Sequence, residues 1–227
     1  MSAVMSTQGR LPSFAEERFE RWWDMNGEWV EAPNLRRGGE SGVKRLLARG
    51  RPPLYSKRQL DHTYRSLLHP FGWPTALRED AALRDCRRLG VPVPEVVFCA
   101  ARRHQRRWQA LLITEELQGY RSLDQWYADG PDEDARRAML RQLAQVLQRL
   151  HGGRRQHGCL YAKHIYLRGD GEQIQVALLD LEKSRRRLLR QRAVRHDLRQ
   201  LERHRGGMPD SDWTFLLACY YSVADGN

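Results

Sequence analysis

Cysteines, long apolar runs and internal repeats are scarce or absent in this sequence, and each shortage argues against a class of protein. The four cysteines lie far apart and form no Cys-x-x-Cys pair, so neither a zinc site nor a disulfide framework is indicated. The apolar run Phe215–Tyr221 is far shorter than the roughly 20 residues that a membrane-spanning helix needs. Residues 1–14 lack the apolar stretch of a secretory signal. We therefore expect a cytoplasmic protein with reduced cysteines.

Positive charge is what the sequence has in excess. Lysine and arginine number 39 against 28 aspartate and glutamate residues, a formal net charge of +11. This excess predicts attraction to polyanions, whether nucleic acid, acidic lipid headgroups or phosphorylated sugars, without choosing among them. Hydrophobic residues make up 41%, enough for a packed core. The length suits one two-lobed domain or two small ones, and no linker-like stretch marks a division.

The first half of the chain is predicted to hold most of the strands. Apolar residues at helical spacing predict a helix over residues 14–24, and a second helix is predicted over 75–90 with Thr75 as its N-cap. Alternating stretches predict strands, and a basic turn over 102–107 joins the last two. The predicted strands begin at 29–30 and lie over 43–46, 54–58, 93–98 and 109–114.

The second half is predicted to be mostly helical, which makes the fold class α+β. We expect a helical extension over residues 1–27, a strand-rich lobe over about 28–115 and a helical lobe over about 120–227. The elements predicted in the second half are a long helix over 132–151, short strands over 164–168 and 174–179, a basic helix over 186–205 and a last helix from about Asp210.

Two features of the first half suit phosphoryl transfer. The glycines of Gly38-Gly39-x-x-Gly42, between two predicted strands, would let backbone N–H groups approach phosphate oxygens, although a plain hairpin turn explains them more simply. Lys57 on a strand and Glu79 on the next helix suit the pair that directs a lysine toward the α- and β-phosphates of ATP. Taken alone, they are more simply explained as solvated surface charges.

Two further features lie in the second half. The segment His157–Ile165 directly follows the long predicted helix. Asp180 follows an apolar strand, where its carboxylate could coordinate Mg²⁺, although a turn or a helix cap is the simpler explanation. Each of the four features has a simpler explanation when taken alone. Their order and spacing together favour a kinase-like domain.

These features fall in stretches that resemble one known family. HGCLYAKHI followed by LLDLEKSR is the specific part, and the likeness runs from about residue 28 to the C-terminus. The sequence resembles the Kdo/heptose lipopolysaccharide kinase family, in particular its InaA-like branch. The resemblance implies a protein-kinase-like two-lobed fold, use of ATP with Mg²⁺, and phosphorylation of inner-core sugars of lipopolysaccharide at the cytoplasmic membrane face. The other stretches are RRGGESG, LYSKRQ, PTALRE, LGVPVPEVVF, LLITEEL, LH at 150–151 and RHDLRQLER.

The resemblance also implies roles for single residues. The three glycines match the phosphate-covering loop, Lys57 matches the phosphate-binding lysine, and Glu79 matches its partner. Glu115 lies in the stretch that matches the hinge, which meets adenine through backbone groups. The residues implied to bind nucleotide are Gly38, Gly39, Gly42, Lys57, Glu79 and Glu115.

The implied catalytic residues are His164, Asp180 and the residue at position 159. Asp180 matches the Mg²⁺-binding aspartate, although Leu-Glu replaces the Phe-Gly that follows it in kinases. His164 falls where kinases place the catalytic-loop asparagine, so Asp180 and His164 are the implied metal ligands. Asp197 matches a buried aspartate that braces this loop. Cys159 aligns with the catalytic aspartate, whose action as a general base typically contributes about 10²–10⁴-fold.

The cysteine leaves two kinase-like interpretations open, because phosphoryl transfer depends chiefly on positioning and charge neutralisation. One is an active kinase whose partner is a lipopolysaccharide core or another lipid-linked sugar. The other is a nucleotide-binding pseudokinase with a regulatory or stress-related role. A non-enzymatic nucleic-acid-binding module is a further alternative, but no helix-turn-helix, zinc-finger or RNP-type motif supports it.

The basic stretch Lys183–Arg205 carries ten lysines and arginines against two carboxylates, Asp197 and Glu202. A solvated helix face is one interpretation. The other is a surface that meets anionic lipid or a phosphorylated core sugar, at about 1 kcal/mol per basic residue close to a membrane. The second interpretation predicts peripheral contact with the inner face of the inner membrane.

Overall fold

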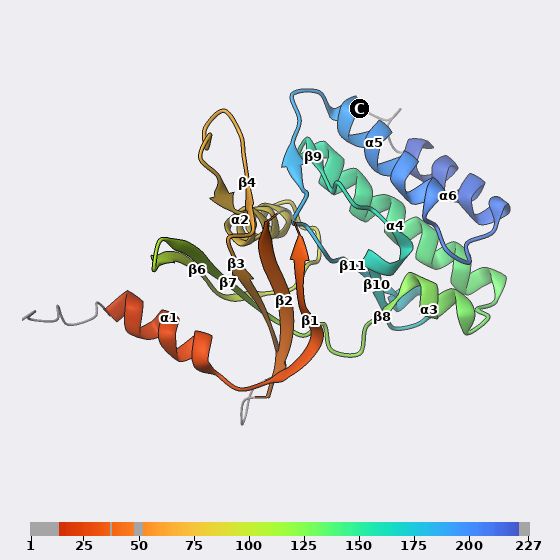
Figure 1. The fold of residues 1–227 in the computed structure, drawn as a ribbon. Coiled ribbons are helices and arrows are strands. Elements are labelled where there is room, and N and C mark those ends of the chain that lie inside the picture. Colours follow the sequence, from red (N-terminus) through yellow and green to blue (C-terminus); the bar gives the residue numbers. More distant parts are fainter. Residues whose placement is uncertain (1–13, 37, 48–51, 223–227) are drawn as a thin grey trace, which may run out of the picture.

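A computed structural model describes residues 14–36, 38–47 and 52–222. Residues 1–13 of the predicted extension and Arg37 of the glycine-rich stretch lie outside the described residues. The N-terminal region is strand-rich and the C-terminal part is largely helical, as the sequence predicted (Figure 1). The domain boundaries given above stay proposals. Within the described ranges, no helix combines the length and apolar character needed to cross a membrane.

The N-terminal region is built on a five-stranded antiparallel sheet with strand order β1-β2-β3-β7-β6. Residues 110–113 in the middle of β7 are all buried, because this strand lies between β3 and β6 and also touches the helix α2. The elements of this region are α1 (Phe14–Asp24), β1 (Glu28–Arg36), β2 (Gly39–Leu46), β3 (Leu54–Leu60), β4 (Thr63–Tyr64), β5 (Trp73–Pro74), α2 (Thr75–Arg88), β6 (Val96–His104) and β7 (Arg107–Glu115).

The helix α1 has the bounds predicted from its apolar spacing, and it packs against β6. Phe19 is buried, and the guanidinium of Arg102 lies 4.3 Å from the centroid of its ring. The rings of Trp22 and Phe98 are 6.2 Å apart between centroids. The predicted extension therefore contacts the edge strand of the sheet.

The predicted N-cap of α2 was wrong. The N-cap is Pro74, and Thr75 is the first residue of the helix. The side-chain amide oxygen of Gln59, on β3, accepts hydrogen bonds from the Thr75 hydroxyl and the Ala76 N–H, both at 3.0 Å. A side chain from the sheet thus satisfies the helix N-terminus, a contact that local sequence does not reveal.

The glycine-rich stretch is only partly a turn, which corrects the sequence interpretation. Gly38 has a positive φ of 75° and open space around it, but Gly39 and Gly42 belong to β2. A Cβ atom on Gly39 would lie 2.6 Å from the backbone of Asp61, and one on Gly42 would lie 2.8 Å from the ring of Trp29. Close packing within the sheet therefore accounts for these two glycines.

The strands β6 and β7 are longer than predicted, because the basic segment between them is mostly strand. Only Gln105 and Arg106 form the turn, and both have positive φ. Two central residues with positive φ are typical of the tight turns that match the twist of a hairpin.

The C-terminal part packs its helices around α4, whose most extensive contacts are with α6 (Figure 1). The long helix begins after its N-cap Asp132, whose side chain accepts a hydrogen bond from the Ala135 N–H. The basic helix is shorter than predicted and spans Arg190–Arg203. The elements are β8 (Arg121–Ser122), α3 (Leu123–Ala128), α4 (Glu133–Gly152), β9 (Arg155–Gln156), η1 (Ala162–His164), β10 (Ile165–Arg168), η2 (Gly171–Gln173), β11 (Gln175–Leu178), β12 (Arg185–Arg186), α5 (Arg190–Arg203) and α6 (Asp210–Ser222).

Candidate active site

Lys57 lies at the centre of a group of carboxylates. Its Nζ is 2.6 Å from Glu79 Oε2 on α2 and 3.4 Å from Glu182 Oε2, which follows β11. Burial acts to lower the pKa of Lys57, but the negative charges of Glu79, Glu182 and Asp180 outweigh it and hold that pKa well above its ordinary value. Lys57 is therefore a fixed positive charge, and the predicted Lys57–Glu79 pair is formed.

Asp180 occupies a strained backbone position just after β11. Its φ of 57° lies in the left-handed region, which costs energy for a residue other than glycine. Burial acts to raise the pKa of its carboxyl group, but the positive charges of Lys57 and neighbouring groups outweigh burial and lower that pKa. The side chain is 41% exposed, so an ionised carboxylate is presented at an accessible point beside Lys57.

His164 turns its Nε2 atom toward Asp180. Its Nδ1 lies 2.8 Å from the carbonyl oxygen of Cys159, and because a carbonyl can only accept, Nδ1 must carry the proton. In the neutral ring, Nε2 then has a lone pair, and it faces Asp180 Oδ2 at 3.6 Å. Two electron-rich groups that face each other can be bridged by a cation or by a proton on the ring.

The segment from His157 to Cys159 is held by the buried side chain of Asp197, on α5. Asp197 accepts hydrogen bonds from the backbone N–H groups of His157 and Gly158, at 2.6 and 3.0 Å. Burial acts to raise the pKa of Asp197, but hydrogen bonds from His151 and His196 hold it well below its ordinary value. These contacts agree with the bracing role expected of Asp197.

Gly158 has a steric reason to be glycine. Its φ is 91°, and a Cβ atom there would lie 2.5 Å from the carbonyl oxygen of Lys183. The segment that follows Asp180 therefore passes directly over the backbone of residue 158. This contact brings the two stretches that were most specific in the sequence against each other.

Cys159 is buried, with only 3% of its surface exposed. Its backbone N–H donates to His157 Nδ1 at 3.3 Å. Burial, and then the neighbouring thiol of Cys159, raise the pKa of Tyr161 above its ordinary value. Burial also lowers the pKa of His157 to about 4, so His157 is neutral at pH 7. Cys159 thus lies inside the C-terminal core, and its carbonyl oxygen accepts a hydrogen bond from His164.

The stretch after β7 is held by backbone and side-chain contacts. The N–H groups of Glu115 and Glu116 donate to the carbonyl groups of Glu95 and Pro53, both at 2.9 Å. Adenine would therefore have to meet carbonyl groups here, or the N–H groups from Leu117 onward. The Glu116 carboxylate is itself fixed by hydrogen bonds from Arg45 and Tyr55.

Sequence reasoning missed Glu182 as a neighbour of Lys57, and it missed the partners of Glu116 in the hinge stretch. The contacts of Glu116 join residues 71 and 61 positions apart, so no local pattern reveals them. A local signal exists for Glu182, because it lies two residues after Asp180, just past the end of β11.

A magnesium ion fits the donors beside Lys57 only if substrate phosphates complete its shell. Within residues 14–36, 38–47 and 52–222, no cluster of three or more His, Cys, Asp or Glu side chains is placed to enclose a metal. Mg²⁺, however, is usually bound by one or two carboxylates with phosphate oxygens and water. Asp180, with Glu182 or His164 beside it, meets that requirement.

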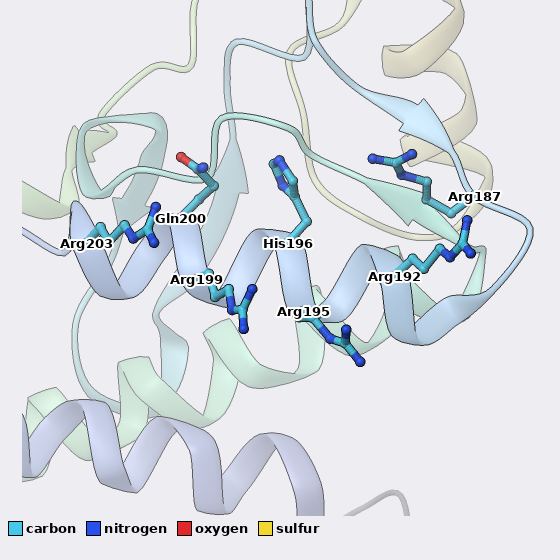
Figure 2. Close-up of a pocket in the computed structure, with 7 residues that line it drawn as sticks. All are labelled: Arg187, Arg192, Arg195, His196, Arg199, Gln200 and Arg203. Atoms are coloured by element: carbon cyan, nitrogen blue, oxygen red, sulfur yellow. The ribbon is translucent and has the colours of Figure 1, made fainter.

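A separate basic cavity of about 380 Å³ lies along α5 (Figure 2). It is connected to the segment that leads to His157, because Arg187 Nε donates to Gln156 Oε1 at 2.5 Å. Burial, and then the nearby positive charges of Arg185 and Arg192, lower the pKa of Arg187. Such crowding of like charges favours the approach of an anion. The cavity is lined by Arg187, Arg192, Arg195, His196, Arg199, Gln200 and Arg203.

A strand-rich region with a Lys57–Glu79 ion pair, set against a helical part that carries Asp180, is the arrangement of protein-kinase-like proteins. Comparison with known proteins agrees. Residues 20–220 match the model of the lipopolysaccharide kinase (Kdo/WaaP) family, and the chain belongs to this family. The chain is 42% identical over 211 residues to Protein InaA of Escherichia coli (strain K12), and the match covers 91% of this chain and 97% of InaA.

A solved structure supports the same fold. The structure described as WaaP in complex with acyl carrier protein superposes with a TM-score of 0.68 at 19% sequence identity. The superposition covers 92% of this chain and 84% of that one. The predicted α+β, protein-kinase-like fold is thus confirmed.

Proposed function

We propose that this protein uses Mg²⁺ and ATP to phosphorylate an inner-core sugar, heptose or Kdo, of lipopolysaccharide or of a lipid-linked precursor. The observation that carries the proposal is the Lys57–Glu79 ion pair, with 2.6 Å between Nζ and Oε2, beside the strained and accessible carboxylate of Asp180. Membership of the lipopolysaccharide kinase family supports the kinase class. The reaction would take place in the cytoplasm, at the inner face of the inner membrane.

Each side chain has a distinct role in this proposal. Lys57, oriented by Glu79, binds the α- and β-phosphates of ATP. Asp180 and His164 hold the metal, which when bound neutralises the charge that develops on the transferred phosphoryl group. The turn at Gly38 is open enough to let backbone N–H groups approach phosphate oxygens.

Transfer of labelled phosphate from ATP to purified lipopolysaccharide inner core tests the proposal. Cores that end in Kdo alone are compared with cores that also carry heptose, so that the acceptor sugar is identified in the same experiment. The proposal expects Mg²⁺-dependent labelling of one of the two. Absence of labelling in both, with a folded protein that binds nucleotide, would instead favour a pseudokinase.

The pseudokinase is the second candidate, and the observation that favours it is the burial of Cys159. Its thiol lies in the core, at the position that the family resemblance aligns with the catalytic aspartate. A buried thiol is a poor acceptor for the proton of a sugar hydroxyl. Nucleotide binding would not need this residue, since Lys57 and Asp180 are the side chains proposed to hold the phosphates and the metal.

We expect Cys159→Ala to change the rate of phosphate transfer by less than about threefold, because the proposed mechanism relies on positioning and charge neutralisation. The transfer rate and the nucleotide-dependent melting temperature are measured together. Cys86→Ala is the matched control, since Cys86 is also a buried thiol but lies on α2. A large loss of transfer in Cys159→Ala alone, with folding and nucleotide affinity intact, would show that the thiol takes part in the chemistry.

A further inference from the structure

Five large apolar side chains project into solvent from two short segments. Leu67, Leu68 and Phe71, between β4 and β5, are 102%, 86% and 92% exposed. Leu188 and Leu189, between β12 and α5, are 86% and 52% exposed. We call these five residues the apolar edge. Exposed apolar residues that gather in this way mark an interaction surface rather than random surface composition.

The first segment is held in a defined shape, with its leucines turned outward. Ser66 and His69 exchange backbone hydrogen bonds at 3.2 and 3.1 Å, which places Leu67 and Leu68 at the tip of a closed turn. The ring of His69 stacks on Trp73, with 4.7 Å between centroids. The tip therefore does not fold back onto the core, although that would bury its leucines.

The second segment is anchored beside the candidate active site. The strand β12 pairs with β9, which directly precedes His157, and the Arg187 N–H donates to the Arg154 carbonyl at 2.8 Å. Leu189 is the N-cap residue of α5. The apolar tip at Leu188 is thus rigidly connected to the loop that carries His164.

Both segments project at the same edge of the molecule (Figure 1). The loop after β4 and the connection between β12 and α5 both reach the upper margin of this view, above α2. The helix α2 also links them through contacts, since Arg186 of β12 pairs with Asp85 of α2 at 3.2 Å and Arg78 of α2 lies over the ring of Tyr64 in β4.

The sequence around both tips has no carboxylate. None occurs between Asp61 and Glu79, or between Glu182 and Asp197. The second interval holds seven basic residues and leads into the cavity of arginines on α5 (Figure 2). Asp85 on α2 forms ion pairs with Arg88, Arg155 and Arg186, so three guanidinium groups offset its charge. The apolar edge therefore lies in positive surroundings.

We infer that the apolar edge inserts into an anionic lipid bilayer, with the arginines around it at the level of the headgroups. Separate apolar tips flanked by cationic side chains, with aromatic rings at the base, suit the interface of a membrane better than the flat surface of a protein partner. This inference deepens the proposed function and rests on its membrane location. Insertion of the apolar edge would orient the protein on the membrane. The β9–β12 pair would then hold His164 at a constant distance from the lipid surface.

Co-sedimentation of the full chain with lipid vesicles tests the inference, and it needs no nucleotide or acceptor. Vesicles of phosphatidylethanolamine with phosphatidylglycerol are compared with vesicles of phosphatidylcholine. We expect binding to the anionic vesicles only. The double variants Leu67→Ser/Leu68→Ser and Leu188→Ser/Leu189→Ser should each weaken binding by about tenfold or more, because each removes two inserted leucines.

Leu47→Ser is the matched control, because Leu47 is 76% exposed but lies away from the apolar edge. It follows the end of β2 that pairs with the start of β3, whereas the segment with Leu67 and Leu68 follows the opposite end of β3. It should bind vesicles like the wild type, and all variants should keep the wild-type melting temperature. Unchanged vesicle binding in both double variants, or no binding by the wild type, would overturn the inference. So would a wild-type dimer that both double variants abolish while vesicle binding persists. Failure of phosphate transfer alone would affect the proposed function and not this result.

Discussion

Asp180→Asn is expected to reduce Mg²⁺-dependent phosphate transfer by at least about 10²-fold. The amide is nearly isosteric with the carboxylate but carries no charge, so it is a much weaker ligand for a hard cation. Asp180 also contributes to the negative field that holds Lys57 protonated. Initial rates of transfer, measured over a range of Mg²⁺ concentrations, should show a higher metal requirement as well as the lower rate.

Asp170→Asn is the matched control for this substitution. Asp170 is an exposed aspartate in the connection between β10 and β11, whereas Asp180 follows β11. It should transfer phosphate at the wild-type rate. A wild-type rate and metal dependence in Asp180→Asn, with the control behaving as expected, would remove Asp180 from the proposed metal site.

Asp197→Ala is expected to lower the free energy of unfolding by about 3–5 kcal/mol. The substitution leaves the N–H groups of His157 and Gly158 and the ring of His151 without their acceptor in a site that solvent does not reach. Denaturant unfolding of the variant and the wild type measures the difference. Any residual phosphate transfer should also fall, because the segment that carries Cys159 and His164 loses its support.

Glu202→Ala serves as the control, since Glu202 is an exposed carboxylate on the same helix. Its effect on the free energy of unfolding should be within about 0.5 kcal/mol. A loss of stability in Asp197→Ala no larger than in Glu202→Ala would mean that Asp197 does not brace the loop.

The fold could be predicted where a long periodic segment specified it. The bounds of α1 followed from the spacing of its apolar residues, and α4 was displaced by one residue. The start of α2 could not be predicted, because the Thr75 hydroxyl and the Ala76 N–H donate to the side chain of Gln59, which lies on the strand β3. Gly39 and Gly42 suggested a loop, but the close packing that requires them exists only in the assembled sheet.

The candidate site shows the same division between local and tertiary signals. Lys57, Glu79 and Asp180 were proposed from their order along the chain, and the structure brings them into one group. The partners of Glu116 could not be found in this way, because they are distant in sequence. The exposure of the apolar edge was equally invisible, since Leu67 and Leu188 look like core residues until the fold leaves them outside.

Calorimetric titration with a non-hydrolysable ATP analogue tests the central claim most directly, namely that Lys57 and Asp180 belong to a Mg²⁺-nucleotide site. The account predicts saturable binding to the wild type that requires Mg²⁺ and is lost in Lys57→Ala, while Lys44→Ala, a lysine substitution on the neighbouring strand β2, retains it. Equal binding by the wild type and Lys57→Ala, or no binding by the folded wild type, would contradict it.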